Sequence, residues 1–95
     1  MSDVVSAAVA ALNAKFGGGF DGTAKFVING EGTIMLDGAG ARAGDGDADV
    51  TLTADADTFQ GILAGQVNPT AAFMMGRLSV DGNMGLAMQL GAALS

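Results

Sequence analysis

The spacing of apolar residues is helical in the first segment of the chain. Apolar side chains recur there at intervals of three or four residues, at Val5, Val9, Leu12 and Phe16. This spacing predicts an amphipathic helix. Ser2 or Asp3 is expected to cap its start, and Gly17 is expected to end it.

From residue 23 the apolar residues alternate instead. Within Thr23–Ile28 every second side chain is apolar on one face, which predicts a strand with one buried side. Asn29-Gly30 is a strong hairpin signal, and Thr33–Leu36 is expected to return as the partner strand. A short strand around Ala41–Ala43 and a clear one at Val50–Ala54 complete this part of the predicted sheet.

Two short helices are predicted next. Asp57 followed by Gln60 resembles a capping box and is expected to open a helix that Gly65 ends. Asn68-Pro69 is expected to start the second helix, with asparagine as the cap and proline at the first helical position. A last strand is expected over Arg77–Asp81.

The predicted terminal helix, from Asn83 to about Leu94, contains no charged residue. Two of its sides are apolar, one formed by Met84, Ala87, Met88 and Gly91, the other by Leu86, Leu90 and Leu94. We therefore expect water to reach little of this helix. Three explanations stay open: burial in the domain's own core, a protein partner or dimer contact, or a cover over a cavity for an apolar ligand.

Composition narrows the function classes. The 95 residues are enough for one domain, residues 1–95, and the net charge is −6. Nucleic-acid binding is not expected, because the four cations are scattered and tryptophan and tyrosine are missing. Histidine and cysteine are also missing, and most carboxylates lie in predicted turns, so we expect no catalytic residue, no metal and no cofactor.

The chain is expected to be a small acidic cytoplasmic protein. Asp3 precedes the apolar segment Val4–Leu12, where an export signal has positive charge. The last residues, Ala93-Leu94-Ser95, do not form a peroxisomal signal. No segment is long and apolar enough to predict a membrane span.

One acidic motif imitates the start of a calcium-binding loop. Asp45, Asp47 and Asp49 have the spacing of the first ligands of such a loop. The loop also requires glycine at its sixth position and glutamate at its twelfth, where this chain has Val50 and Ala56. We therefore expect solvated turn carboxylates here.

Residues 49–91 resemble the sterol carrier protein type-2 family of small lipid-binding domains. The segment reads DVTLTADADTFQGILAGQVNPTAAFMMGRLSVDGNMGLAMQLG. The features that carry the resemblance occur in the family's order: the strand Asp49–Thr53, Asp57-x-Phe59, Asn68-Pro69, Ala72-Phe73, Gly76-Arg77-Leu78-x-Val80-x-Gly82 and Asn83-Met84-Gly85-Leu86-Ala87-Met88.

The resemblance implies an α+β fold, with a five-stranded, mainly antiparallel sheet and helices packed on one face around an apolar tunnel. It implies non-catalytic binding, transfer or presentation of a fatty acyl chain, phospholipid, isoprenoid or sterol-like lipid, with transient membrane contact. The alternative is an interaction module that uses its apolar helices to form a homodimer or to dock on an enzyme. The residues expected to line the tunnel are Phe26, Ile34, Leu36, Val50 and Leu52 as its floor, Phe59, Ile62, Leu63, Phe73 and Met74 as its walls, and Met84, Met88 and Leu90 as a movable lid.

Overall fold

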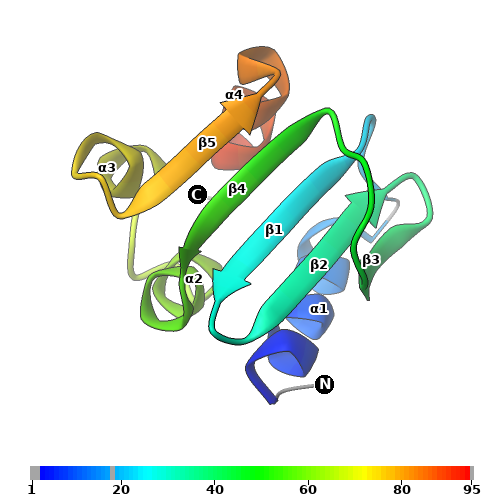
Figure 1. Ribbon diagram of the computed structural model, residues 1–95, viewed down its shortest axis with the longest axis horizontal. Helices are drawn as coiled ribbons and strands as arrows, with labels where there is room; N and C mark the ends of the chain where they lie inside the picture. Colours follow the sequence, from blue (N-terminus) through cyan, green and yellow to red (C-terminus); the bar gives the residue numbers. More distant parts are fainter. Residues whose placement is uncertain (1–2, 18, 95) are drawn as a thin grey trace.

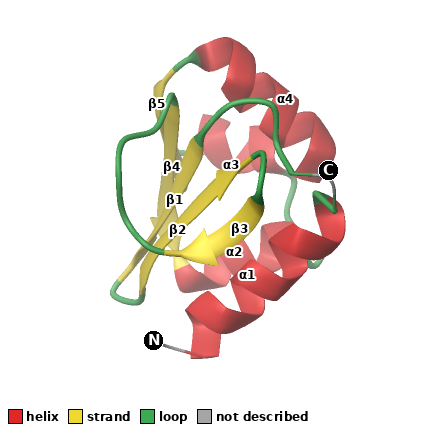
Figure 2. Ribbon diagram, turned by 90° about the vertical axis from the view of Figure 1, so that its right-hand side faces the viewer, coloured by secondary structure: helices red, strands yellow, loops and turns green. Residues whose placement is uncertain are grey.

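The protein folds as a five-stranded sheet with four helices on one face, as the sequence predicts (Figures 1 and 2). The computed structural model describes residues 3–17 and 19–94. The strand order is β3-β2-β1-β4-β5; β1 and β4 are parallel, and the other neighbouring pairs are antiparallel. The elements in chain order are α1 (Asp3–Lys15), β1 (Ala24–Asn29), β2 (Gly32–Asp37), β3 (Gly40–Ala43), β4 (Val50–Asp55), α2 (Ala56–Leu63), α3 (Pro69–Met74), β5 (Leu78–Gly82) and α4 (Met84–Leu94).

The first helix packs under the β2–β3 side of the sheet (Figure 1). Its buried side chains are Val5, Ala8 and Leu12, whereas Val9 is half-buried. The predicted stripe is therefore turned slightly, because the small Ala8 side chain faces the sheet. Asp3 lies in the first helical turn, and Ser2 lies outside the described residues.

The hairpin between β1 and β2 has the predicted turn. Asn29 and Gly30 occupy its two central positions, and the Glu31 N–H donates to the Ile28 carbonyl oxygen at 3.0 Å. Gly30 has φ +79°, a conformation that glycine adopts without steric cost. Ala24, Phe26 and Ile28 all face the helices and are buried, which confirms the predicted alternation.

The connection from β3 to β4 crosses the face of the sheet that has no helices (Figure 2). Lys25 and Met35 are paired across β1 and β2 on that face. Lys25 Nζ forms an ion pair with Asp45 Oδ1 of the crossing loop at 2.9 Å, and Met35 is 5% exposed. Asp49 Oδ2 in turn accepts a hydrogen bond from the Thr23 N–H at 3.2 Å. Asp45 and Asp49, two of the three aspartates that have the spacing of a calcium-binding loop, therefore hold this loop on the sheet.

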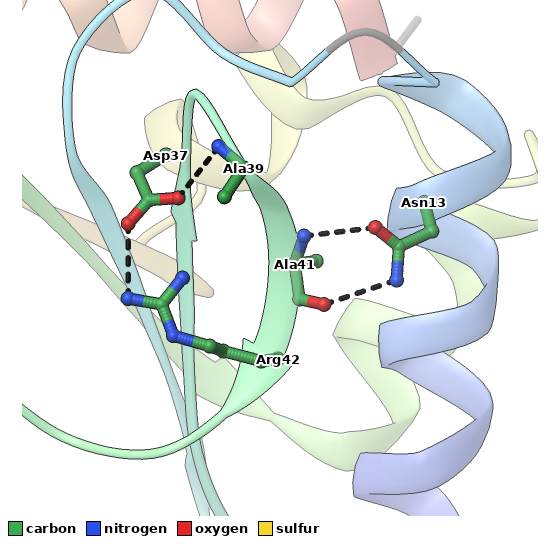
Figure 3. Close-up of polar contacts among 5 residues, drawn as sticks. All are labelled: Asn13, Asp37, Ala39, Ala41 and Arg42. Atoms are coloured by element: carbon green, nitrogen blue, oxygen red, sulfur yellow. Dashed lines mark hydrogen bonds and ion pairs between the residues drawn. The ribbon is translucent and has the colours of Figure 1, made fainter.

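The edge strand β3 is covered by an asparagine of α1 (Figure 3). Asn13 Oδ1 accepts from the Ala41 N–H at 2.8 Å, and Asn13 Nδ2 donates to the Ala41 carbonyl oxygen at 3.0 Å. These are the backbone groups that a further strand would pair with, so the amide blocks edge-to-edge association here. The adjacent Arg42 lies 2.9 Å from Asp37, and this contact lowers the pKa of the Asp37 carboxyl.

The cap of α2 differs from the prediction. Asp55, not Asp57, is the N-cap: its side chain accepts from the Thr58 N–H at 2.7 Å. Asp55 is the last residue of β4 and has the extended conformation that a cap requires (φ −77°, ψ 169°), whereas Asp57 is already in the first helical turn. The chain thus passes from strand to helix without a loop.

This cap predicts a specific dependence of stability on pH. The hydrogen bonds from Thr58, first its backbone N–H and then its side chain, lower the pKa of Asp55 below its ordinary value of 3.8. A lowered carboxyl pKa adds stability above the unfolded-state pKa, and this contribution is lost as pH falls through the folded-state pKa. In Asp55→Asn the amide oxygen caps the helix at every pH. Urea unfolding should therefore show that the unmodified protein loses free energy of unfolding, relative to Asp55→Asn, as the pH falls below about 4. A difference that is constant with pH would contradict this role of Asp55.

Candidate functional site

The short helix α3 begins as the sequence predicts. Asn68 Oδ1 accepts from the N–H groups of Thr70 (2.9 Å) and Ala71 (3.1 Å), and Pro69 stands at the first helical position. Pro69 and Ala72 are the buried residues of this helix. The following Phe73 is 44% exposed, although it is large and apolar.

After α3 the chain turns back into the edge strand β5, which pairs with β4. Gly82 ends β5 at φ +104°, and a Cβ there would collide with the backbone of Asp49, so only glycine fits this close approach. Asn83 then caps α4, as predicted, by accepting from the Leu86 N–H at 3.0 Å. Helices α3 and α4 therefore lie on the β5 side of the sheet (Figure 1).

An apolar groove of about 380 Å³ lies between α3, α4 and the inner face of β4 and β5. It is open to solvent. Its lining contains no charged side chain, and Thr70 supplies its one side-chain hydroxyl. The lining residues are Leu52, Pro69, Thr70, Phe73, Leu78, Val80, Met84, Ala87, Met88, Gly91 and Ala92.

Helix α4 presents its two apolar sides to different surroundings. Leu90 and Leu94 are buried in the core, with Leu90 fully inaccessible. Met84 and Met88 are exposed, Met88 to 74%. The expectation that water reaches little of this helix is therefore wrong, because α4 packs on β4 and β5 through its leucine side. The domain's own core does not bury the methionine side.

The predicted lining residues lie in three places. Leu52, Phe73, Met84 and Met88 line the groove. Met74 is 79% exposed and lies outside the groove lining. The remaining residues pack in the core or against it: Phe26, Ile34, Leu36, Val50, Phe59, Ile62, Leu63 and Leu90.

A second, smaller groove lies between α1 and α2. Its volume is about 240 Å³, and its lining includes Ile28, Phe59 and Leu63. Phe59 also packs edge-on against Phe26, with the ring centroids 5.8 Å apart. The first groove is bounded by α3 and α4 and the second by α1 and α2, so different helices bound the two grooves.

Several groove residues were not predicted from the sequence. The sequence pattern places Pro69 at the start of a helix and Leu78 and Val80 in a strand, and neither placement indicates a lining role. The part of the sequence that indicates the groove is α4, where Ala87 and Gly91 share a side with Met84 and Met88. Small residues there leave the groove open above the strands.

Among the described residues, the charged side chains lie outside the groove lining. Arg77 follows α3, and its Nη2 donates to Thr58 Oγ1 of α2 at 3.2 Å. Within residues 3–17 and 19–94, no three acidic side chains gather in a way that could hold a metal ion. Across the same residues, no helix has the length and apolar character needed to cross a bilayer.

Comparison with known proteins identifies a family. The sequence pattern of the SCP-2 sterol transfer family matches residues 6–95. The chain is 36% identical over 83 residues to peroxisomal multifunctional enzyme A of Dictyostelium discoideum, which covers 87% of this chain and 18% of that protein. It is 43% identical over 64 residues to sterol carrier protein 2 of Rattus norvegicus, covering 67% of this chain and 11% of that protein. The chain thus spans less than a fifth of either relative.

The fold is shared with a solved structure. The solution structure of sterol carrier protein 2 of Aedes aegypti, in complex with the C16 fatty acid palmitate, superposes with a TM-score of 0.81. The sequence identity is 20%, and the superposition covers 100% of this chain and 97% of that one.

Proposed function

Because the chain belongs to the SCP-2 sterol transfer family, we propose that the groove between α3, α4 and β4–β5 binds the apolar chain of a lipid. The observation that carries this proposal is the groove's lining, which is apolar apart from the Thr70 hydroxyl. Its volume, about 380 Å³, falls within the range of roughly 300–1,000 Å³ that small-molecule sites occupy.

The energy available from such a groove is large. Burial of one methylene is worth about 0.8 kcal/mol, so full burial of a sixteen-carbon chain would yield roughly 12 kcal/mol before the costs of binding. The Aedes aegypti relative is described with a ligand of this length. Since the groove is open on one side, part of each methylene stays in water and the gain is smaller.

The polar end of the ligand is expected to remain in solvent. None of the lining residues carries a charge, and the protein has a net charge of −6. A carboxylate or phosphate inside the groove would lose its hydration without gaining an ionic partner. The site is therefore suited to an acyl, isoprenoid or sterol-like chain, whatever its head group.

We propose that residues 1–95 act as one lipid-binding unit and catalyse no reaction themselves. The sequence has neither histidine nor cysteine. The function is then to transfer lipid, with transient membrane contact, or to present it to an enzyme. The relationship to a multifunctional enzyme, of which the chain matches 18%, is compatible with presentation.

The test is organic extraction of the gently purified protein, followed by lipid mass spectrometry and by titration with a fluorescent fatty acid. We expect a near-stoichiometric lipid or tight uptake of the probe. Met88→Glu should abolish both, because it places a charge in the groove lining at an exposed position where the fold tolerates it. Neither bound lipid nor probe uptake in the unmodified protein would contradict the proposal.

The alternative function is that of an interaction module, which the exposure of Met84 and Met88 favours. In that case the ligand-free protein forms a homodimer or docks on an enzyme through α4. Analytical ultracentrifugation distinguishes the two: a monomer–dimer equilibrium without lipid, lost in Met88→Glu while the fold is retained, would support the alternative.

A further inference from the structure

Exposed apolar side chains gather on one part of the molecule. Among the described residues, every large apolar side chain that is exposed belongs to α3, its C-cap or α4. We call this set the methionine surface: Phe73, Met74, Met75, Met84 and Met88. Figure 1 shows α3 and α4 together on the β5 side of the molecule.

The methionine surface is continuous with the groove. Phe73, Met84 and Met88 are exposed and also line it. Met74 lies one helical turn after Thr70, a lining residue, so its side chain projects from the same side of α3. Met75 follows directly as the C-cap. Whatever contacts this surface therefore meets the groove opening.

The surface is also electrically neutral, unlike the rest of the chain. Helices α3 and α4 contain no charged residue. The charged residues within 58–95 are Arg77 and Asp81 alone, whereas nine of the ten acidic residues of the chain lie within 1–57. Anionic membranes repel a chain of net charge −6, but a zwitterionic bilayer does not.

We propose that the methionine surface docks on a zwitterionic phospholipid bilayer, with the groove opening toward the lipids. This inference rests on the proposed function, because a docked groove lets a chain move between bilayer and protein without crossing water. A second copy or a protein partner on the same residues would instead close the opening. Flexible methionine side chains also suit a disordered lipid surface.

Helix α1 also has an exposed face, but that face is neither apolar nor free of charge. On α1 the exposed residues include Asp3 and Lys15, and none of the exposed large apolar side chains is on that helix. Charge and small side chains give α1 little apolar area to insert. The structure therefore assigns docking to α3 and α4.

The test is flotation of the full chain with phosphatidylcholine vesicles, and with vesicles that also contain phosphatidylserine, at low and high salt. We expect binding to phosphatidylcholine that salt hardly changes and that added phosphatidylserine does not strengthen. Met74→Gln/Met75→Gln should weaken vesicle binding at least tenfold, equivalent to about 1.4 kcal/mol. The double variant should take up fluorescent fatty acid as the unmodified protein does, because neither residue lines the groove.

Ala14→Gln, an exposed position on α1, is the matched control and should leave vesicle binding unchanged. Unaltered vesicle binding by the double variant would overturn the inference. So would binding that high salt abolishes, or a ligand-free dimer that the double variant loses. Vesicle binding by a protein that neither carries lipid nor takes up fatty acid would refute the proposed function but leave the docking surface in place, so the two failures are distinguishable.

Discussion

Gly91→Leu is expected to lower the affinity for a fatty acid at least about 100-fold, or about 2.7 kcal/mol, without weakening the fold. Gly91 lines the groove, and a Cβ built there has no heavy atom within 4 Å outside its own helical turn. A leucine side chain can therefore enter the groove. Displacing three or four ligand methylenes at about 0.8 kcal/mol each accounts for the loss.

The same substitution should leave thermal stability unchanged or raise it. Glycine inside a helix is about 0.8–1.0 kcal/mol less favourable than alanine, and leucine is nearly as good as alanine. The matched control is Ala93→Leu, which adds the same side chain to an exposed position of α4 outside the groove lining. It should bind fatty acid normally. Normal binding by Gly91→Leu as well would show that the ligand does not occupy this groove.

Leu90→Ala is expected to lower the free energy of unfolding by about 2–5 kcal/mol, the typical cost of removing a fully buried leucine side chain. Met88→Ala, two residues earlier on α4, should change it by only about 0.5 kcal/mol, because that side chain is exposed. Urea denaturation of the two variants provides the comparison. Both replace a large side chain with alanine, so helix propensity contributes little to the difference.

This pair tests the orientation of α4. The leucine side of the helix holds it on β4 and β5, while the methionine side faces the groove and solvent. If Leu90→Ala and Met88→Ala lower the free energy of unfolding by the same amount, this orientation of α4 is wrong. A large loss for Met88→Ala alone would mean that the methionines, not the leucines, form the core contact.

Much of the fold could be predicted because its determinants are local. Alternation at Ala24, Phe26 and Ile28 identifies a half-buried strand wherever that strand pairs. Asn68 and Asn83 cap helices through hydrogen bonds within three residues, which a sequence window contains. The sequence does not identify Asp55 as the cap, because this residue is also the last one of β4 and the sequence does not show where strand pairing stops.

The site was harder to predict, because alternation indicates which face a side chain lies on but not which helix covers it. Phe26 and Leu52 face the same side of neighbouring strands. Phe26 is covered by the ring of Phe59, whereas Leu52 lies under the gap between α3 and α4 and lines the groove. That difference depends on how far apart the helices lie, which is a property of the packed structure. The pattern of small residues and methionines on α4 carried the usable information.

The most direct test of the groove is methionine-methyl NMR during titration with a C16 fatty acid. The chain contains an internal control: Met84 and Met88 line the groove, whereas Met35 is buried under the crossing loop on the opposite face of the sheet. The proposed site predicts that the methyl resonances of Met84 and Met88 shift as ligand is added, while that of Met35 does not. Unshifted Met84 and Met88 resonances at saturating ligand, or a shift confined to Met35, would contradict it.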